Sequence, residues 1–242
     1  MRAVLVIAML ATGCIDAIDP KWTLDHDHIV AMRLSRPGLA PGESALIDAL
    51  VAHEGAPVTI EEPLEAAGVT TAPSLEGAIY TDGGRWYAYG PSEATLALAR
   101  EELGLAADAP VPLDVYAAFA RPSGEPMIAK KRVWLGVALH NPAPPVAAMN
   151  DAIMPDVATE GPRAGLAPEI VVPTIGDTYF STNVADGWRV NWLSSCGTLF
   201  QDDVARSFLR VMDEDPREGE LAVVVRDPDG GVAWRVWPIR SE

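Results

Sequence analysis

Short apolar runs separated by turn residues dominate the chain, and no long helical period does. Several runs alternate between apolar and polar residues, as in residues 113–119 (LDVYAAF), which is typical of a strand with one buried face. Turn sequences lie between the runs, such as Asp-Gly-Gly at 82–84 and again at 229–231. Many short strands at regular turn spacing predict an all-β fold of the sandwich or barrel type. The expected strands are 28–34, 44–52, 58–62, 77–80, 85–89, 111–120, 127–137, 170–172, 178–183, 189–194, 207–212, 220–226 and 232–239.

One segment has the pattern of a helix instead. Ser92 follows a proline and is a good N-cap, and Gly104 is a good stop signal. Between them the apolar residues recur at roughly helical spacing: Leu96, Leu98, Ala99 and Leu103. The sequence therefore predicts a single short helix within an otherwise β-rich chain.

An internal repeat indicates how the chain is divided. Residues 112–135 and 219–239 each contain a strand, a turn rich in Pro and Gly, and a second strand that contains Arg-Val-Trp. The two Arg-Val-Trp copies begin 103 residues apart, and ~100 residues is the size of one immunoglobulin-like sandwich. The predicted organisation is a signal peptide at 1–13, a tether at 14–25, a first domain at 26–139 with an insertion at about 70–105, a linker at 140–145, and a second domain at 146–242.

The N-terminus has the features of an export signal. Arg2 precedes an eight-residue apolar run, and a small-residue segment then leads into Cys14. The run is too short to span a bilayer as a helix, which takes ~20 residues. The segment resembles the bacterial lipoprotein signal, in which the cysteine after a small residue receives fatty acyl chains such as palmitate. The resemblance implies a lipid anchor on Cys14, and Ile15 in place of Asp favours the outer membrane of a Gram-negative bacterium. A buried N-terminal strand with an incidental cysteine is the alternative.

Charge and cysteine count exclude several functional classes. The net charge of −16 argues against binding to nucleic acid and against electrostatic attachment to anionic lipid. Two cysteines cannot form a disulfide-rich scaffold or a cysteine-based zinc module. Phosphate-binding and dinucleotide-binding loops are absent from the sequence, so we expect no cofactor.

The second half carries a family resemblance on residues 188–199 (WRVNWLSSCGTL) and 219–234 (GELAVVVRDPDGGVAW). These segments resemble bacterial lipoproteins with tandem immunoglobulin-like domains, such as those of myxobacteria. The resemblance implies two tandem immunoglobulin-like β-sandwiches, the first with a small helical insertion, and it implies that Trp192 packs between the sheets. It carries no information about activity, because this fold hosts many functions.

Three histidines are the first candidates for chemistry. His26 and His28 are two residues apart, so on a strand both imidazoles would face one side and could meet a metal ion. His53 could be a third ligand. The alternative is a solvated start of a strand, because no second ligand motif has the matching spacing.

Acidic loops offer a second site. Asp227 and Asp229, with the clusters at 202–203 and 213–215, supply the oxygen ligands that Ca²⁺ prefers. However, Asp-x-Asp-Gly also forms a stable turn without any metal.

Aromatic residues in the predicted strand 85–89 form a third candidate site. Alternation places Tyr87 and Tyr89 on one face and Trp86 on the other, which is either a partner surface or a small core that seals the insertion. The serines beside Cys196 suggest a nucleophile, but no Gly-x-Ser-x-Gly elbow is present. Cys196 is either buried or free to cross-link a partner.

From these patterns we expect a lipid-anchored envelope protein that acts as a binding or structural module and not as an enzyme. Its partners would be the membrane, through Cys14, and a protein of the envelope. The alternatives are a metal-binding accessory protein or enzyme on the same scaffold, and a subunit of an envelope or secretion complex.

Overall fold

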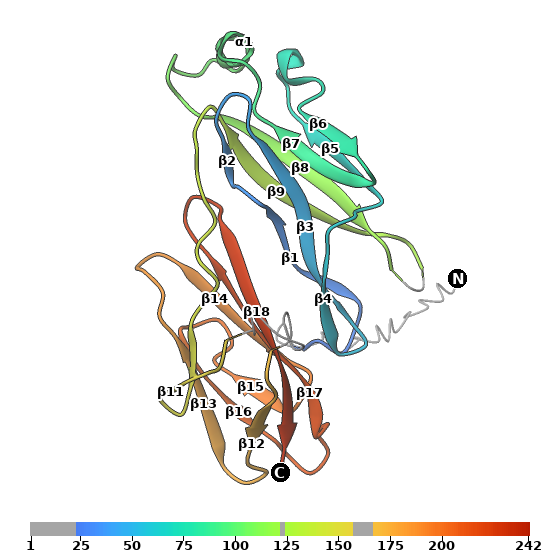
Figure 1. Cartoon of the computed structure of the whole chain (residues 1–242), viewed down its shortest axis with the longest axis vertical. Helices are drawn as coiled ribbons and strands as arrows, with labels where there is room; N and C mark the ends of the chain where they lie inside the picture. The colour runs from blue at the N-terminus through green and yellow to red at the C-terminus, as the bar shows by residue number, and fades with distance from the viewer. Residues whose placement is uncertain (1–22, 122–123, 157–166) are drawn as a thin grey trace, which may run out of the picture.

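The computed structural model describes residues 23–121, 124–156 and 167–242, and it places two β-sandwiches in succession (Figure 1). The first sandwich has one sheet of order β1-β3-β7-β6, with β4 also paired to β3, and a second sheet of order β2-β9-β8-β5. Its strands are β1 (His28–Leu34), β2 (Gly38–Leu39), β3 (Ser44–His53), β4 (Ala56–Ile60), β5 (Glu65–Val69), β6 (Ile79–Asp82), β7 (Arg85–Tyr89), β8 (Val111–Phe119) and β9 (Met127–Leu135).

The second sandwich repeats this plan with sheets of order β11-β10-β13-β16-β15 and β12-β18-β17-β14. Its strands are β10 (Ala147–Met149), β11 (Ala152–Ile153), β12 (Ile170–Val172), β13 (Asp177–Thr182), β14 (Arg189–Ser194), β15 (Thr198–Phe200), β16 (Arg206–Arg210), β17 (Glu218–Arg226) and β18 (Val232–Ser241). In each sandwich a short strand, β2 or β12, pairs in parallel with the last strand of its sheet, β9 or β18.

This strand order is that of the immunoglobulin fold. The sheets β1-β3-β7-β6 and β10-β13-β16-β15 have the order A-B-E-D, and the sheets that end in β9-β8-β5 and β18-β17-β14 have the order G-F-C. The prediction of an all-β chain with two tandem immunoglobulin-like sandwiches is therefore confirmed. The first sandwich differs from the second by the β3–β4 hairpin and by a helix between β7 and β8.

The helix α1 (Glu93–Leu103) begins and ends where the sequence indicates. The hydroxyl of Ser92 accepts a hydrogen bond from the Thr95 amide, and Gly104 ends the helix in the left-handed conformation at φ 66°. A 3-10 turn, η1 (Pro73–Leu75), lies beside it. Within the range 70–105, β6 and β7 belong to the main sheet, so the helical addition is limited to α1 and its flanking turns.

Each sandwich has its own apolar core between its two sheets. Trp192 on β14 is fully buried in the second core, as predicted. Its ring lies 5.8 Å from that of Phe180, and its indole nitrogen donates to the Val204 carbonyl at 3.1 Å. The chain thus uses a buried tryptophan on this strand, with its polar atom satisfied, at the centre of the second core.

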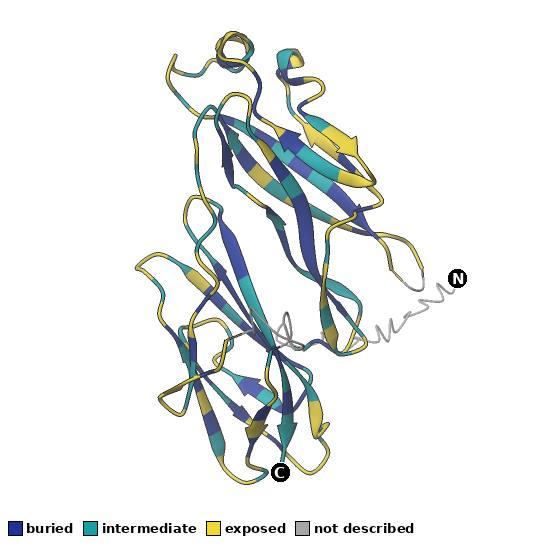
Figure 2. Cartoon of the chain, in the orientation of Figure 1, coloured by how far each residue is buried: buried dark blue, intermediate teal, exposed yellow. Residues whose placement is uncertain are grey.

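A third apolar cluster, here called the seam, joins the two sandwiches. It forms because the outer faces of β1 and β3 meet the outer faces of β14, β17 and β18 (Figure 1). Ile47, Ala49 and Val51 of β3 face the first core, whereas Leu50 and Ala52 face the seam. Figure 2 shows the resulting buried stretches of β3 and β18. The buried seam residues are Leu24, Ala31, Leu50, Ala52, Leu193, Ala222, Val224 and Val232, with Val30, Trp234 and Val236 packed against them.

Polar contacts also cross the seam. The Ser195 hydroxyl donates to the Gly55 carbonyl at 2.7 Å, and its oxygen accepts from the Glu220 amide at 2.9 Å. Asn141, between the sandwiches in sequence, donates to the Leu34 carbonyl and accepts from the Val232 amide. These hydrogen bonds fix the relative orientation of the two sandwiches, which apolar contact alone does not specify.

Among the described residues, no helix is long and apolar enough to cross a membrane.

Candidate functional site

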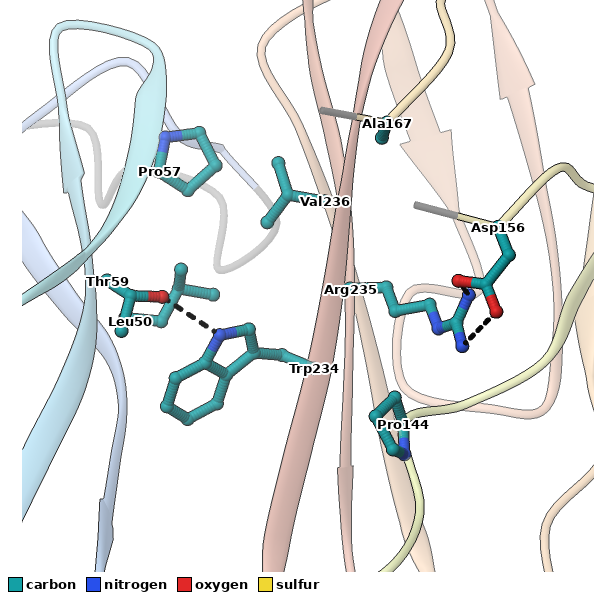
Figure 3. Close-up of a pocket in the computed structure, with 9 residues that line it drawn as sticks. All are labelled: Leu50, Pro57, Thr59, Pro144, Asp156, Ala167, Trp234, Arg235 and Val236. Carbon is teal, nitrogen blue, oxygen red and sulfur yellow. Dashed lines mark hydrogen bonds and ion pairs between the residues drawn. The ribbon is translucent and has the colours of Figure 1, made fainter. Parts of the chain in front are cut away.

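A groove of about 370 Å³ opens between β4 and β18 along the seam (Figure 3). Trp234, Leu50 and Val236 are among the apolar residues that line it. The indole nitrogen of Trp234 donates to the Thr59 hydroxyl at 3.2 Å. The guanidinium carbon of Arg33 lies 3.9 Å from the centre of the Trp234 ring, close enough for a cation–π contact. The ring belongs to the second sandwich and is therefore held by two residues of the first.

Two ion pairs border this groove and the seam. On the β18 side, Arg235 forms a bidentate pair with Asp156 (Figure 3), and 15% of its side chain is exposed. On the β3 side, the Arg33 Nε donates to Asp48 Oδ1 at 3.0 Å. Burial raises the pKa of Asp48, and the neighbouring Arg33 acts in the opposite direction. The groove thus combines apolar walls with fixed charges.

A second, larger cleft of about 680 Å³ lies farther along the same two segments, beside Ala56 and Pro238, and is lined by carboxylates. These are Asp25, Glu54, Glu169, Glu218 and Glu220. Burial raises the pKa of Glu220, and Glu169 is paired with Arg240 at 2.7 Å. In the part of the chain that the structure describes, no three His, Cys, Asp or Glu side chains are arranged to hold a metal ion.

The three histidines do not converge on one point. The rings of His26 and His28 stack with centroids 4.5 Å apart, and the His28 Nδ1 lies 2.9 Å from the His26 carbonyl oxygen. Burial lowers the pKa of His28. His53 instead pairs with Asp27, with 2.6 Å between Nδ1 and Oδ1, and this hydrogen bond raises the pKa of His53. A metal site at His26 and His28 stays a prediction, without His53 as its third ligand.

The aspartates proposed for calcium sit at the β17–β18 turn. One carboxylate oxygen of Asp227 accepts a hydrogen bond from the Gly231 amide at 2.6 Å, and Gly230 adopts a φ of 90°. Asp229 is exposed at the tip. The turn therefore uses Asp227 to satisfy its own backbone, and calcium binding remains an untested prediction.

The aromatic side chains of strand β7 lie on its two opposite faces, as the alternation in the sequence predicts. Trp86 packs against the first core, whereas Tyr87 stacks on Tyr80 with centroids 5.4 Å apart. Tyr80 and Tyr89 are 38% and 39% exposed. Tyr80 was not among the predicted residues, although the Asp-Gly-Gly turn between β6 and β7 places it opposite Tyr87. We call Tyr80, Tyr87 and Tyr89 the tyrosine patch.

A second aromatic group was also missed. Tyr179, Phe208 and Phe200 lie directly opposite one another on β13, β16 and β15, on the face of the second sandwich away from the seam. The rings of Phe200 and Phe208 are 4.7 Å apart, and Arg206 and Arg210 lie over the two ends of the row. Only the strand register, which the sequence does not give, brings these residues together.

The thiol of Cys196 is fully buried in the second core, and burial raises its pKa to about 11. The neighbouring Ser194 hydroxyl donates to the Cys196 carbonyl at 2.7 Å. Both groups therefore serve the local structure. Cys14 lies outside the described residues.

No protein-family model matches the chain, and no curated protein does. Among solved structures, murine CEACAM1b is 11% identical, with 88% of this chain and 100% of that one covered at a TM-score of 0.28. The tandem Ig repeats of Dlar are 10% identical over 89% of this chain and 97% of theirs, at a TM-score of 0.27. The human desmocollin-1 ectodomain is 12% identical over 90% of this chain at 0.26, and this chain spans only 37% of it. Scores this low carry no functional argument.

Proposed function

We propose that this protein is a lipid-tethered module of the bacterial cell envelope that binds or positions a partner protein and catalyses no reaction. The observation that carries the proposal is the seam. Two sandwiches joined only by a linker would move independently. Here an apolar contact and the hydrogen bonds across it hold the two sandwiches together as one rigid unit. A rigid unit holds binding surfaces at a fixed height and orientation.

The start of the described chain supports a tether that leaves from the seam. Thr23 forms a parallel bridge with Ser194, and Leu24 is fully buried between the sandwiches. The Leu24 carbonyl accepts from the Gly55 amide at 2.9 Å. An extended chain covers at most ~3.6 Å per residue, so acyl chains on Cys14 would hold the membrane within about 32 Å of Thr23. Both sandwiches would then lie near the membrane.

Exposed and half-buried aromatic residues on both sandwiches support a protein partner. The tyrosine patch lies on the first sandwich, and the row Tyr179, Phe208 and Phe200 lies on the second. Tyrosine is enriched where proteins bind one another, because its ring buries apolar area and its hydroxyl hydrogen-bonds at the rim.

The experiment is expression of the full chain in a Gram-negative bacterium with an alkyne-labelled palmitate. We expect the wild-type protein to incorporate label and to sediment with membranes. Cys14→Ser should lose both properties, and Cys196→Ala, the matched control, should retain both. An unlabelled, soluble wild-type protein would refute the anchor.

Two further measurements separate the rival functions. Cross-linking in intact membranes should capture a protein partner at the tyrosine patch, and Tyr87→Ala should weaken the capture. A melting temperature that rises specifically with Zn²⁺ or Ca²⁺ would favour the metal-binding alternative instead.

A further inference from the structure

A small apolar cavity opens at the end of the first sandwich, between the β3–β4 hairpin and the residues that flank the turn from β8 to β9. Its volume is about 320 Å³, and its apolar walls include Val51, Val58, Ile60 and Met127. Val51 and Met127 belong to the first core, and Ile60 packs against that core. The cavity therefore connects the interior of the first sandwich with its surface.

The strand β4 provides the open wall of this cavity. Val58 lies directly opposite Val51, and Ile60 lies opposite Ala49, so these side chains continue the core-facing side of β3. Val51 is only 3% exposed, whereas Val58 is 54% exposed. The sandwich thus covers Val51 and leaves Val58 open. An apolar surface left open beside a core is typical of a ligand site.

The second sandwich closes the corresponding end with its own side chains. The end of β13 corresponds to the end of β3, because it pairs with the start of β10 as β3 pairs with the start of β1. After β13, Val184 and Trp188 pack against the second core. After β3, the chain turns into β4 instead. The cavity therefore results from the hairpin by which the first sandwich differs from the second.

Three polar residues also line the cavity: Asp27, His53 and Arg121. The His53 side chain is 40% exposed and Arg121 is exposed, so the polar part of the lining meets solvent. The Asp27 carboxylate lies 2.6 Å from the His53 Nδ1, and the Asp27 carbonyl accepts a hydrogen bond from the Arg121 Nη2 at 3.3 Å. Asp27 thus connects the end of β3 with the end of β8 at the surface of the cavity.

The charges at this surface leave one cation without a counter-ion. The carboxylates of Asp27 and Glu54 both lie against His53, at 2.6 Å and 3.9 Å. Within the described part of the chain, Arg121 makes its one hydrogen bond to a carbonyl and pairs with no carboxylate. A guanidinium group has five N–H donors, so most of those of Arg121 are available to a ligand. The cavity therefore combines an apolar interior with a positive charge at its opening.

We propose that this cavity binds a single hydrocarbon chain that ends in an anionic group, such as a medium-chain fatty acid. The chain would lie against Val58, Ile60 and Met127, and the carboxylate would accept charge-assisted hydrogen bonds from Arg121. The cavity lies at the lower end of the range of about 300–1,000 Å³ for ligand sites, which suits one short chain and excludes a two-chain lipid. The inference rests on the cavity and is independent of the proposed anchor.

The test is isothermal titration calorimetry on the full chain with Cys14→Ser, in which no attached acyl chain can compete. Octanoate should bind at one site per chain. Its Kd should be about tenfold lower than that of hexanoate, because two more methylene groups leave water. 1-Octanol, which lacks the charge, should bind roughly 3- to 10-fold more weakly than octanoate.

Two pairs of variants separate the apolar wall from the charge. Val58→Trp should fill the cavity and abolish binding of octanoate and of 1-octanol. Val69→Trp is the matched control, because Val69 is 57% exposed on β5 and does not line the cavity, and it should bind octanoate as the parent chain does. Arg121→Gln should remove the preference for octanoate over 1-octanol, whereas Arg217→Gln, on the second sandwich, should keep that preference.

Nuclear Overhauser effects from the terminal methyl group of octanoate locate the chain without any substitution in the cavity. They should reach the methyl groups of Met127 and Val58 in the Cys14→Ser chain. Contacts elsewhere, full binding by Val58→Trp, or no binding of octanoate would overturn the proposal, and an unchanged preference in Arg121→Gln would overturn the anionic group. Sedimentation with phosphatidylglycerol vesicles without binding of octanoate would assign the cavity to a membrane lipid and would also overturn it.

Discussion

The hairpins β8–β9 and β17–β18 occupy the same place in their two sandwiches, yet their outer faces have opposite character. The outer face of β8–β9 carries Asp114, which pairs with Lys130 and Arg132. The outer face of β17–β18 carries Ala222, Val224 and Val236 and is covered by the first sandwich. The fold is the same in both, so the difference in outer-face residues matches the difference in docking.

The repeated Arg-Val-Trp sequence illustrates the same point in detail. In β9 the central Val133 faces the core and Trp134 lies on the outer side, half-buried. In β18 the outer Val236 faces the seam, and Trp237 faces the core. The copies are therefore one residue out of step on the pleat, and such a slip exchanges the two faces of a strand. A sequence repeat need not place equivalent residues in equivalent surroundings.

The largest loss of stability is expected when a charged side chain is placed in the seam. Val224→Asp buries an unpaired carboxylate between the sandwiches and should lower the free energy of unfolding by more than about 3 kcal/mol. Tyr116→Asp, on the outer face of β8, should change it by less than about 1 kcal/mol. Urea unfolding monitored by tryptophan fluorescence compares the two, and equal losses would contradict the comparison.

A smaller effect is expected from the outer tryptophans. Trp234→Ala removes a ring that contacts Arg33 and hydrogen-bonds Thr59 across the seam, and it should cost about 2 kcal/mol. Trp134→Ala removes a ring whose nearest cation, Arg132, is 5.9 Å away within the same strand, and it should cost about 1 kcal/mol. The same urea measurement applies, and a reversed order would show that the seam does not depend on Trp234.

The smallest effect on stability is expected on the outer face of β8–β9, where Asp114 forms its ion pairs. Hydrogen bonds from Arg132 and Lys130 lower the pKa of Asp114 to about 2, below its value in the unfolded chain. The stabilisation is therefore complete above about pH 4 and is lost as the pH falls toward 2. Because solvent screens this pair, Asp114→Asn should cost only about 1 kcal/mol at pH 7, and the difference from wild type should shrink as the pH falls to 2.5. Unfolding midpoints of wild type and Asp114→Asn at pH 7, 4 and 2.5 measure this difference. A difference that does not change with pH would exclude the pairing of Asp114 with Arg132 and Lys130.

The sequence predicts the elements better than their association. Alternation and turn residues locate β1 and β7 to the residue, and the caps Ser92 and Gly104 locate α1. Alternation says which residues share a face, but it does not say which two faces meet. The unbroken apolar run Leu221–Val225 was the available signal, since a strand buried on both faces loses its alternation.

The sequence predicts the candidate site only in part, for a similar reason. Tyr87 and Tyr89 were assigned to one face from the sequence, but their neighbour Tyr80 required the register of β6 against β7. The seam was not predicted, because residues such as Leu50 and Val224 are far apart in sequence and meet only through the docking of two domains. Contacts between distant segments depend on tertiary packing, which a single sequence does not encode in any local pattern.

The distance between spin labels on the two sandwiches tests the rigid seam most directly. Ile128 and Ile175 are 71% and 88% exposed, so cysteines at these positions can be labelled in a Cys14→Ser chain whose Cys196 stays buried. Double electron–electron resonance should give one narrow distance distribution, which Val224→Asp broadens. A distribution that is already broad in the parent chain would show that the sandwiches move independently and would contradict the account.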